Sequence, residues 1–417
     1  MTFTARTDRP LVRTTGGSVR YALLEFVAPK MERTSDRPPV NLAFVLDRSG
    51  SMGGSKIELA RQAIRDALAR LDDRDRFALI AYDDVVDIVT EATPATAEAK
   101  AGALERLARI DARGSTNLSE GWLRGCEQVA LGLAADAISR CLLLTDGLAN
   151  VGIRDPEALR AHAAEIRARG VSTTTFGVGA DFDELLLQSM ADAGGGHFYY
   201  IDSAQKITDI ITSEVGEALE VVARNAAIAA HTPEVLVEQL SPLPFERTGE
   251  ATLVALGDLV SEQSVQVVMK LTFPPGQAGR QHEVTFRLTD RDGVLGGASA
   301  TLTWSHAPHH EVDAQPRDRS VDRVVATLYA AKAREEAVRL NRAGQFDAAR
   351  WALKGVAERI GAYAGDDSAL QAMAGQLMGE QQLFAAPMAA ADLKMRHFAS
   401  ANMSRGRDFE GKANKGR

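Results

Sequence analysis

The sequence is poor in cysteine, in histidine and in long apolar stretches. Its 417 residues include two cysteines and eight histidines. Cys126 falls in a helical pattern and Cys141 opens an apolar strand, so we interpret both as small buried residues and not as a disulfide. No stretch approaches the roughly 20 apolar residues that a membrane-spanning helix needs. The residues after Met1 form no apolar secretory signal, so the sequence predicts a cytoplasmic protein without a membrane span.

Positive charge is also scarce, because the formal net charge is -8 at pH 7. A negative chain is a poor electrostatic match for nucleic acid, so we expect no nucleic-acid partner. Apolar residues make up 45% and charged residues 25% of the chain, which is ordinary for a soluble protein. A chain of this length forms about two or three domains, each with its own core.

The most informative stretch runs from Leu42 to Gly54. Its apolar run Leu-Ala-Phe-Val-Leu ends at Asp47, and small residues follow. Such a run is typical of a central strand in a parallel sheet, and open α/β sheets bind ligands at the carboxyl ends of their strands. Asp47, Ser49 and Ser51 alternate, so a tight turn can direct their oxygens at one point. Hard oxygen ligands without imidazole or thiolate favour Mg2+ or Ca2+.

Further oxygen donors follow in two later segments. The segment Gly114–Leu118 lies between helical patterns and offers the hydroxyl of Thr116. The segment Leu142–Gly147 is another apolar strand that ends in an aspartate, Asp146, before a glycine turn.

Together these residues resemble the metal-ion-dependent adhesion site (MIDAS) of von Willebrand factor type A (VWA) domains. The resemblance covers roughly residues 40 to 215. It implies that the serines and the threonine ligate the metal directly, and that the aspartates do so directly or through water. It also implies that one metal position stays open for a partner's carboxylate. The implied metal ligands are Asp47, Ser49, Ser51, Thr116 and Asp146.

The same loop suggests other chemistries that its residues do not support. Glycines precede Lys56, but Ser55 stands where a phosphate-binding loop needs glycine. A phosphotransferase with an aspartyl nucleophile would want a carboxylate two residues after Asp47, where Ser49 stands instead.

Strand and helix patterns alternate through residues 38–218, which predicts a doubly wound, mostly parallel α/β sheet. The resemblance implies that this sheet is of the VWA, Rossmann-like type. The expected strands are 42–46, 77–82, 85–89, 141–144, 173–178 and 197–201. The expected helices are 55–71, 96–110, 119–133, 156–169, 182–193 and 204–217.

The predicted secondary structure changes after residue 218. Residues 219–305 predict short strands at 235–240, 252–256, 264–273, 282–288 and 298–304, as in an antiparallel β-sandwich. A strand at 18–27 precedes the α/β pattern, so we predict that residues 1–37 belong to the sandwich and that the VWA domain is inserted into it. The run Leu256-Gly-Asp-Leu259 resembles bacterial proteins related to inter-α-trypsin inhibitor heavy chains.

The C-terminal part of the chain predicts helices. Residues 306–318, with His306, His309 and His310, are expected to be a polar linker. Residues 319–404 are expected to form a small α-helical bundle, and the basic residues 405–417 a disordered tail.

The predicted function is a protein-binding module, and not an enzyme. A bound Mg2+, or Ca2+ or Mn2+, would capture an Asp or Glu of a partner protein, and Arg48 and Met52 would line the rim. One alternative is a scaffold with a purely structural metal site, in which the helical region binds the partner. Another is a metal-assisted hydrolase.

Overall fold

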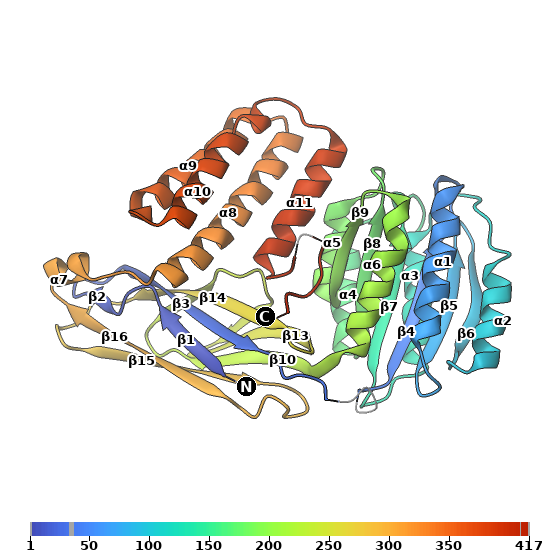
Figure 1. Cartoon of the computed structure of the whole chain (residues 1–417), viewed down its shortest axis with the longest axis horizontal. Helices are drawn as coiled ribbons and strands as arrows, with labels where there is room; N and C mark the ends of the chain where they lie inside the picture. Colours follow the sequence, from blue (N-terminus) through green and yellow to red (C-terminus); the bar gives the residue numbers. More distant parts are fainter. Residues whose placement is uncertain (1, 33–36, 409, 416–417) are drawn as a thin grey trace. The chain divides into compact units, whose positions relative to one another are not determined.

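The computed structural model describes residues 2–32, 37–408 and 410–415 (Figure 1). The chain forms two compact units. The α/β unit comprises Arg33–Glu220 with Glu410–Lys412. The other, which we name the sheet-and-helix unit, comprises Met1–Glu32, Val221–Phe409 and Ala413–Arg417. In the sequence, most of the α/β unit therefore lies between two parts of the sheet-and-helix unit.

The α/β unit contains a sheet with the strand order β6-β5-β4-β7-β8-β9. All neighbours are parallel except β6, which runs antiparallel to β5, so the predicted mostly parallel sheet is observed. Its strands are β4 (Val40–Asp47), β5 (Arg76–Tyr82), β6 (Val86–Pro94), β7 (Ile138–Thr145), β8 (Ser172–Val178) and β9 (Gly195–Ile201). Its helices are α1 (Ser55–Arg70), α2 (Ala97–Leu107), α3 (Leu118–Ala130), α4 (Pro156–Ala168), α5 (Glu184–Gly194) and α6 (Ile207–Leu219), with short 3-10 turns η2 (Gly50–Met52) and η3 (Ala204–Lys206).

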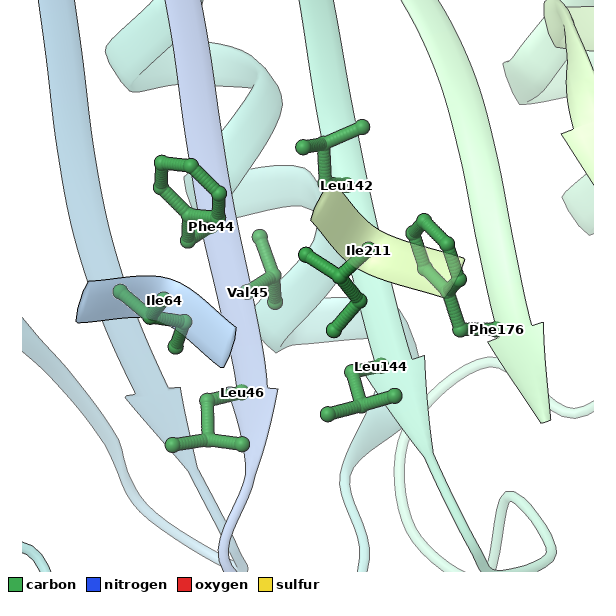
Figure 2. Close-up of a pocket in the computed structure, with 8 residues that line it drawn as sticks. All are labelled: Phe44, Val45, Leu46, Ile64, Leu142, Leu144, Phe176 and Ile211. Atoms are coloured by element: carbon green, nitrogen blue, oxygen red, sulfur yellow. The ribbon is translucent and has the colours of Figure 1, made fainter. Parts of the chain in front are cut away.

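The central strands β4 and β7 are buried at every position. Figure 2 shows Ile64 of α1 and Ile211 of α6 packed among Phe44, Leu142 and Phe176 of the sheet. Fully burying one such side chain contributes about 1.5–3 kcal/mol. This apolar layer fixes the carboxyl ends of β4 and β7, where the polar residues of the site begin.

A buried ion pair anchors the start of the α/β unit. The Arg37 guanidinium donates to both carboxylate oxygens of Asp75, at 2.8 and 2.6 Å. The Val40 amide donates to one of the same oxygens at 2.9 Å. Burial alone would raise the pKa of Asp75, but the bonds from Arg37 and Val40 hold it below its usual value. The pair therefore fixes where β4 enters the sheet.

In the sheet-and-helix unit, β3 (Ser18–Val27) pairs antiparallel with β14 (Ser264–Phe273) along its whole length. The strand ahead of the α/β unit therefore pairs with a strand that follows that unit in the sequence. The order in this sheet is β1-β3-β14-β11. The remaining strands of the sheet are β1 (Phe3–Thr7) and β11 (Leu236–Gln239).

A further sheet has the order β12-β13-β10-β15-β16-β2 and shares a hydrophobic core with the first. It is mixed and not purely antiparallel as predicted, because β2 runs parallel to β16. The three-residue β2 is the edge strand of this sheet, and side chains supply further hydrogen bonds to its backbone. The Leu11 amide donates to Gln315 at 2.8 Å, and the Leu11 carbonyl accepts from Arg20. The strands are β2 (Leu11–Arg13), β10 (Val221–His231), β12 (Phe245–Thr248), β13 (Ala251–Val260), β15 (Gln281–Thr289) and β16 (Ser299–Ala307).

The helical region packs on the β1-β3-β14-β11 sheet through its first long helix. Leu328 and Val325 of α8 join Leu23 and Val268 of the sheet in one hydrophobic cluster. The Tyr21 and Tyr329 hydroxyls are 2.9 Å apart beside this cluster. The helices are α7 (His309–Ala314), α8 (Arg319–Arg342), α9 (Phe346–Ala364), α10 (Ser368–Glu380) and α11 (Ala390–Ser404), with the 3-10 turn η4 (Leu383–Ala385). No helix among the described residues is long and apolar enough to span a membrane.

The predicted linker at 306–318 differs from the observed structure. His306 is buried in β16, where its Nε2 lies 3.1 Å from Nε2 of His282, and residues 309–314 form α7. The histidine lies at the end of an alternating strand that the sequence analysis ends at residue 304, so its burial was missed.

The predicted tail at 405–417 falls partly outside the described residues, as does the predicted segment 1–37. Residues 409, 416 and 417 are not described, nor are residues 1 and 33–36. Within the described part of the tail, the Asn414 carbonyl accepts from the Ser264 amide at 2.7 Å. Lys415 forms an isolated bridge with Gln263.

We predict that a fragment of residues 37–220 folds on its own, because it retains the central sheet, its helices and the Arg37–Asp75 pair. Cooperative thermal unfolding followed by circular dichroism would establish this. In the same fragment, Arg37→Met should lower the free energy of unfolding by about 3–5 kcal/mol, because Asp75 is left buried and unpaired. A fragment that folds only when residues 1–36 are added would contradict the insertion.

Candidate metal centre

The site begins where two neighbouring parallel strands end. β4 ends at Asp47 and β7 ends at Thr145, and Leu46 pairs with Leu144 just before them. Asp146 follows directly. Both aspartates are buried, with 0% and 1% of their surface exposed. The strand register therefore places two carboxyl groups at one edge of the sheet.

Asp47 is held by neutral donors. The Ser49 amide donates to its Oδ1 at 2.8 Å, and the Thr145 hydroxyl donates to its Oδ2 at 2.6 Å. Burial raises the pKa of Asp47 to about 6, although these hydrogen bonds oppose the shift, and the Asp146 carboxylate adds to it. The site therefore contains a buried carboxylate whose charge no bonded side chain neutralises.

The other carboxylate, Asp146, is shared between the serine turn and a lysine. Its Oδ1 accepts from the Ser51 hydroxyl at 2.6 Å, and its Oδ2 accepts from the Lys56 ammonium at 2.5 Å. The Ser49 and Ser51 hydroxyls lie 3.2 Å apart. Asp47, Ser49, Ser51 and Asp146 thus form one connected group of oxygen atoms.

Thr116 reaches the same group from the loop before α3. A Cβ at Gly147 would lie 3.2 Å from the Thr116 hydroxyl and 3.8 Å from that of Ser51, so both hydroxyls face the backbone at Gly147. The Thr116 carbonyl accepts from the amides of Asn150 and Val151 at 3.1 and 3.2 Å. These bonds tie the Thr116 loop to the loop after Asp146. The structure therefore brings all the predicted ligands to one edge of the sheet.

An ion-pair network around the buried Asp83 carboxylate supports the loops. Asp83 Oδ2 accepts from Arg48 Nε at 3.1 Å and from Arg113 Nε at 2.8 Å. Burial would raise the pKa of Asp83, but the Val85 amide and the two guanidinium groups lower it overall. The Arg113 amide donates to the Arg48 carbonyl at 2.7 Å, which joins the serine turn to the Thr116 loop.

This network corrects the prediction that Arg48 and Met52 line the rim. Arg48 is 4% exposed and Met52 is 0% exposed. Arg48 points to the Asp83 carboxylate, and Met52 lies in the short 3-10 turn η2 whose amide bonds bend the chain back on itself. Both residues therefore hold the turn in place and face no partner.

The residues fit a divalent cation of the hard, oxygen-preferring kind. Two buried carboxylates and three hydroxyls converge without imidazole or thiolate. Close by, the Tyr82 hydroxyl is buried and has no hydrogen-bond partner among the described residues. Burial raises the pKa of this phenol, and the charge of Asp47 adds to the shift. A hydrated ion would supply the positive charge that balances Asp47, and one of its water molecules would accept a hydrogen bond from the Tyr82 hydroxyl.

Two residues of this site were missed in the sequence analysis. Thr145 was treated as part of an apolar strand, but its hydroxyl bonds Asp47 and accepts from the Gly147 amide at 3.2 Å. Lys56 was considered only for a phosphate loop. A signal for Lys56 existed in the sequence, because cations are unfavourable in the first turn of a helix, and Lys56 is the second residue of α1.

Among the described residues, His197, Glu214 and Glu217 also lie close enough together to hold a metal. Glu214 is already bonded to the Arg140 guanidinium at 2.8 Å and to the Tyr199 hydroxyl at 2.7 Å. The arginine neutralises the carboxylate and would repel a cation. This group is therefore a poorer metal site than the one at Asp47.

Comparison with known proteins supports the resemblance. Residues 41–213 match the model of the von Willebrand factor type A domain. The chain is 28% identical over 223 residues to the protein YfbK of Escherichia coli (strain K12), covering 53% of this chain and 38% of YfbK. It is 30% identical over 263 residues to inter-alpha-trypsin inhibitor heavy chain H4 of Sus scrofa, covering 61% of this chain and 28% of that protein. The chain thus spans less than half of either relative.

A solved structure extends the similarity beyond the matched domain. The von Willebrand factor type A structure from Catenulispora acidiphila superimposes with a TM-score of 0.69 and covers 93% of this chain and 97% of that one. At 18% sequence identity, this likeness establishes a shared fold and no more.

We predict that Asp146→Asn weakens Mg2+ binding at least about tenfold, because the variant removes one of two carboxylate charges at the site. The amide keeps the volume and an acceptor for Lys56, so the circular dichroism spectrum should not change. Calorimetric titration with Mg2+ measures the effect. The matched control is Asp136→Asn, an exposed carboxylate of the same unit. Equal Mg2+ affinity in both variants would refute the ligand assignment.

Proposed function

Because residues 41–213 form a von Willebrand factor type A domain, a kind of protein-interaction module, we propose that this chain binds a partner protein through a divalent ion. Asp47, Ser49, Ser51, Thr116 and Asp146 hold the ion. An Asp or Glu of the partner completes its coordination. Mg2+ is the proposed ion, with Ca2+ or Mn2+ as substitutes that the same oxygen donors accept.

The observation that carries this proposal is the charge state of the site. Asp47 is fully buried with neutral donors, and its raised pKa shows that burial disfavours its charge. A divalent ion removes this penalty, since two carboxylates neutralise it and hydroxyls add no formal charge. Because three of the five donors are neutral hydroxyls, the ion keeps affinity for one more anion. Because desolvating a carboxylate is costly, burying a partner's Asp or Glu is favourable only where a bound ion compensates for that cost.

The surface around the site suits a protein partner. Leu148 and Val151, in the loop after Asp146, are 50% and 39% exposed. The Val151 amide bonds the Thr116 carbonyl, so this apolar side chain lies beside the proposed ligands. Apolar residues around a charged centre exclude water when a partner covers them, which strengthens the electrostatic contact inside.

One alternative is a scaffold whose metal site is structural and whose helices bind the partner. It is favoured by an exposed aromatic residue on α9, Trp351, with 64% of its surface exposed and Lys354 stacked 4.8 Å above its ring. A metal-assisted hydrolase is less favoured. Lys56 pairs with Asp146 and Arg48 pairs with Asp83, and neither cationic side chain is placed as a general base.

We predict that Thr116→Val lowers partner capture at least about tenfold, because the variant removes a buried hydroxyl at the ion but keeps the side-chain volume. The measurement is a pull-down in Mg2+ from a lysate of cells that express the protein. EDTA treatment of the wild type should give the same loss.

The control for this experiment is Ser115→Ala, which alters an exposed hydroxyl next to Thr116. Retention of the same partners by Thr116→Val and after EDTA would exclude the metal site as the docking surface. Loss of those partners with Trp351→Ala would then support the scaffold alternative.

A further inference from the structure

Lys56 lies against the proposed metal ligands but is not one of them. Its Nζ donates to Asp146 Oδ2 at 2.5 Å and to the Ser51 carbonyl at 3.2 Å. Its side chain is 28% exposed, whereas that of Asp146 is fully buried. The ammonium therefore sits at the mouth of the site, between the buried carboxylate and the solvent.

The position of Lys56 is unfavourable for the helix that carries it. Lys56 is the second residue of α1, and the N-cap residue Gly54 provides no side-chain oxygen to the first turn. The amide groups of a helix N-terminus carry partial positive charge and repel a cation. The lysine is thus held there by Asp146 and Ser51, and its placement serves the site and not the helix.

The two oxygens of Asp146 face different groups. Oδ1 accepts from the Ser51 hydroxyl, on the side of the proposed ion, and Oδ2 accepts from Lys56. The ammonium therefore leaves the hydroxyl side of the site free for the ion. An ion and Lys56 can occupy the site together, on the two oxygens of one carboxylate.

The ammonium retains capacity for a further anion. An ammonium has three N–H donors, and within the described residues Lys56 uses two of them. Gly179 lies near it, since a Cβ there would be 3.8 Å from Nζ. A side chain at this position would therefore contact the ammonium, and glycine supplies none.

We propose that Lys56 is the second half of the carboxylate-binding site, and that the partner's carboxylate binds the ion through one oxygen and Lys56 through the other. The inference rests on the proposed metal-dependent function. Asp47 and Asp146 together balance a divalent ion, so the charge of Lys56 leaves the loaded site with one net positive charge. That excess selects an anionic carboxylate over a neutral amide or hydroxyl.

The role has a signature that a simple counter-ion for Asp146 lacks. Removing the lysine charge relieves its repulsion of the ion, so metal affinity should stay equal or rise. The same change removes one of the two cationic groups that would contact the partner's carboxylate, so the affinity for a carboxylate should fall. If Lys56 only held Asp146 in place, its removal would lower the affinity for the metal ion and leave the carboxylate affinity of the metal-loaded protein unchanged.

The test uses the full chain with Mn2+ as the metal and acetate as the carboxylate. Calorimetry gives the Mn2+ affinity. Water-proton relaxation gives the acetate affinity, because bound acetate displaces water from the ion. Lys56→Met should bind Mn2+ at least as tightly as the wild type and acetate about tenfold more weakly. Lys56→Gln provides a second neutral variant, and Lys56→Arg should retain most acetate binding because it keeps the charge.

The matched control is Lys206→Met, which removes an exposed lysine paired with Asp202 at 2.9 Å. It should leave both affinities unchanged. Wild-type acetate affinity in Lys56→Met would overturn the inference and leave the proposed function standing. Loss of Mn2+ binding in the lysine variants would also overturn it, because Lys56 would then act through the ion. Absence of Mn2+ binding in the wild type would instead refute the proposed function.

Discussion

The proposed metal site depends on two carboxylates that the fold brings together. The register of β4 and β7 brings Asp47 and Asp146 to the ends of adjacent strands, both buried, where their like charges repel. The chain balances only one of them with a side chain, because Lys56 pairs with Asp146 while Asp47 has neutral donors. Burying an unbalanced carboxylate is costly, so a site of this kind is stable chiefly with a cation in it.

The surrounding structure compensates for this cost because several of its other buried charges are paired. Asp75 is held by Arg37, Asp83 by Arg48 and Arg113, and Glu214 by Arg140. The apolar layer between the sheet, α1 and α6 adds to this support (Figure 2). The site is therefore built on rigid elements, with its ligands on short loops that backbone hydrogen bonds tie together.

The strength of local patterns decided how much could be predicted from the sequence. The apolar runs before Asp47 and Asp146 predicted both central strands, because strands buried on both faces have continuous apolar sequences. β2 was missed because side chains from Arg20 and Gln315 complete its pairing, and such long-range partners leave no periodicity. The burial of Arg48 was missed for a similar reason. An arginine beside a ligand loop looks exposed until Asp83, 35 residues away, is known to face it.

The most direct test of the central claim is anomalous diffraction from crystals of the full chain grown with Mn2+. We expect one strong anomalous peak bounded by Asp47, Ser49, Ser51, Thr116 and Asp146, with Lys56 still bonded to Oδ2 of Asp146. A peak at His197, Glu214 and Glu217 instead, or no peak at the Asp47 loop at saturating Mn2+, would contradict it.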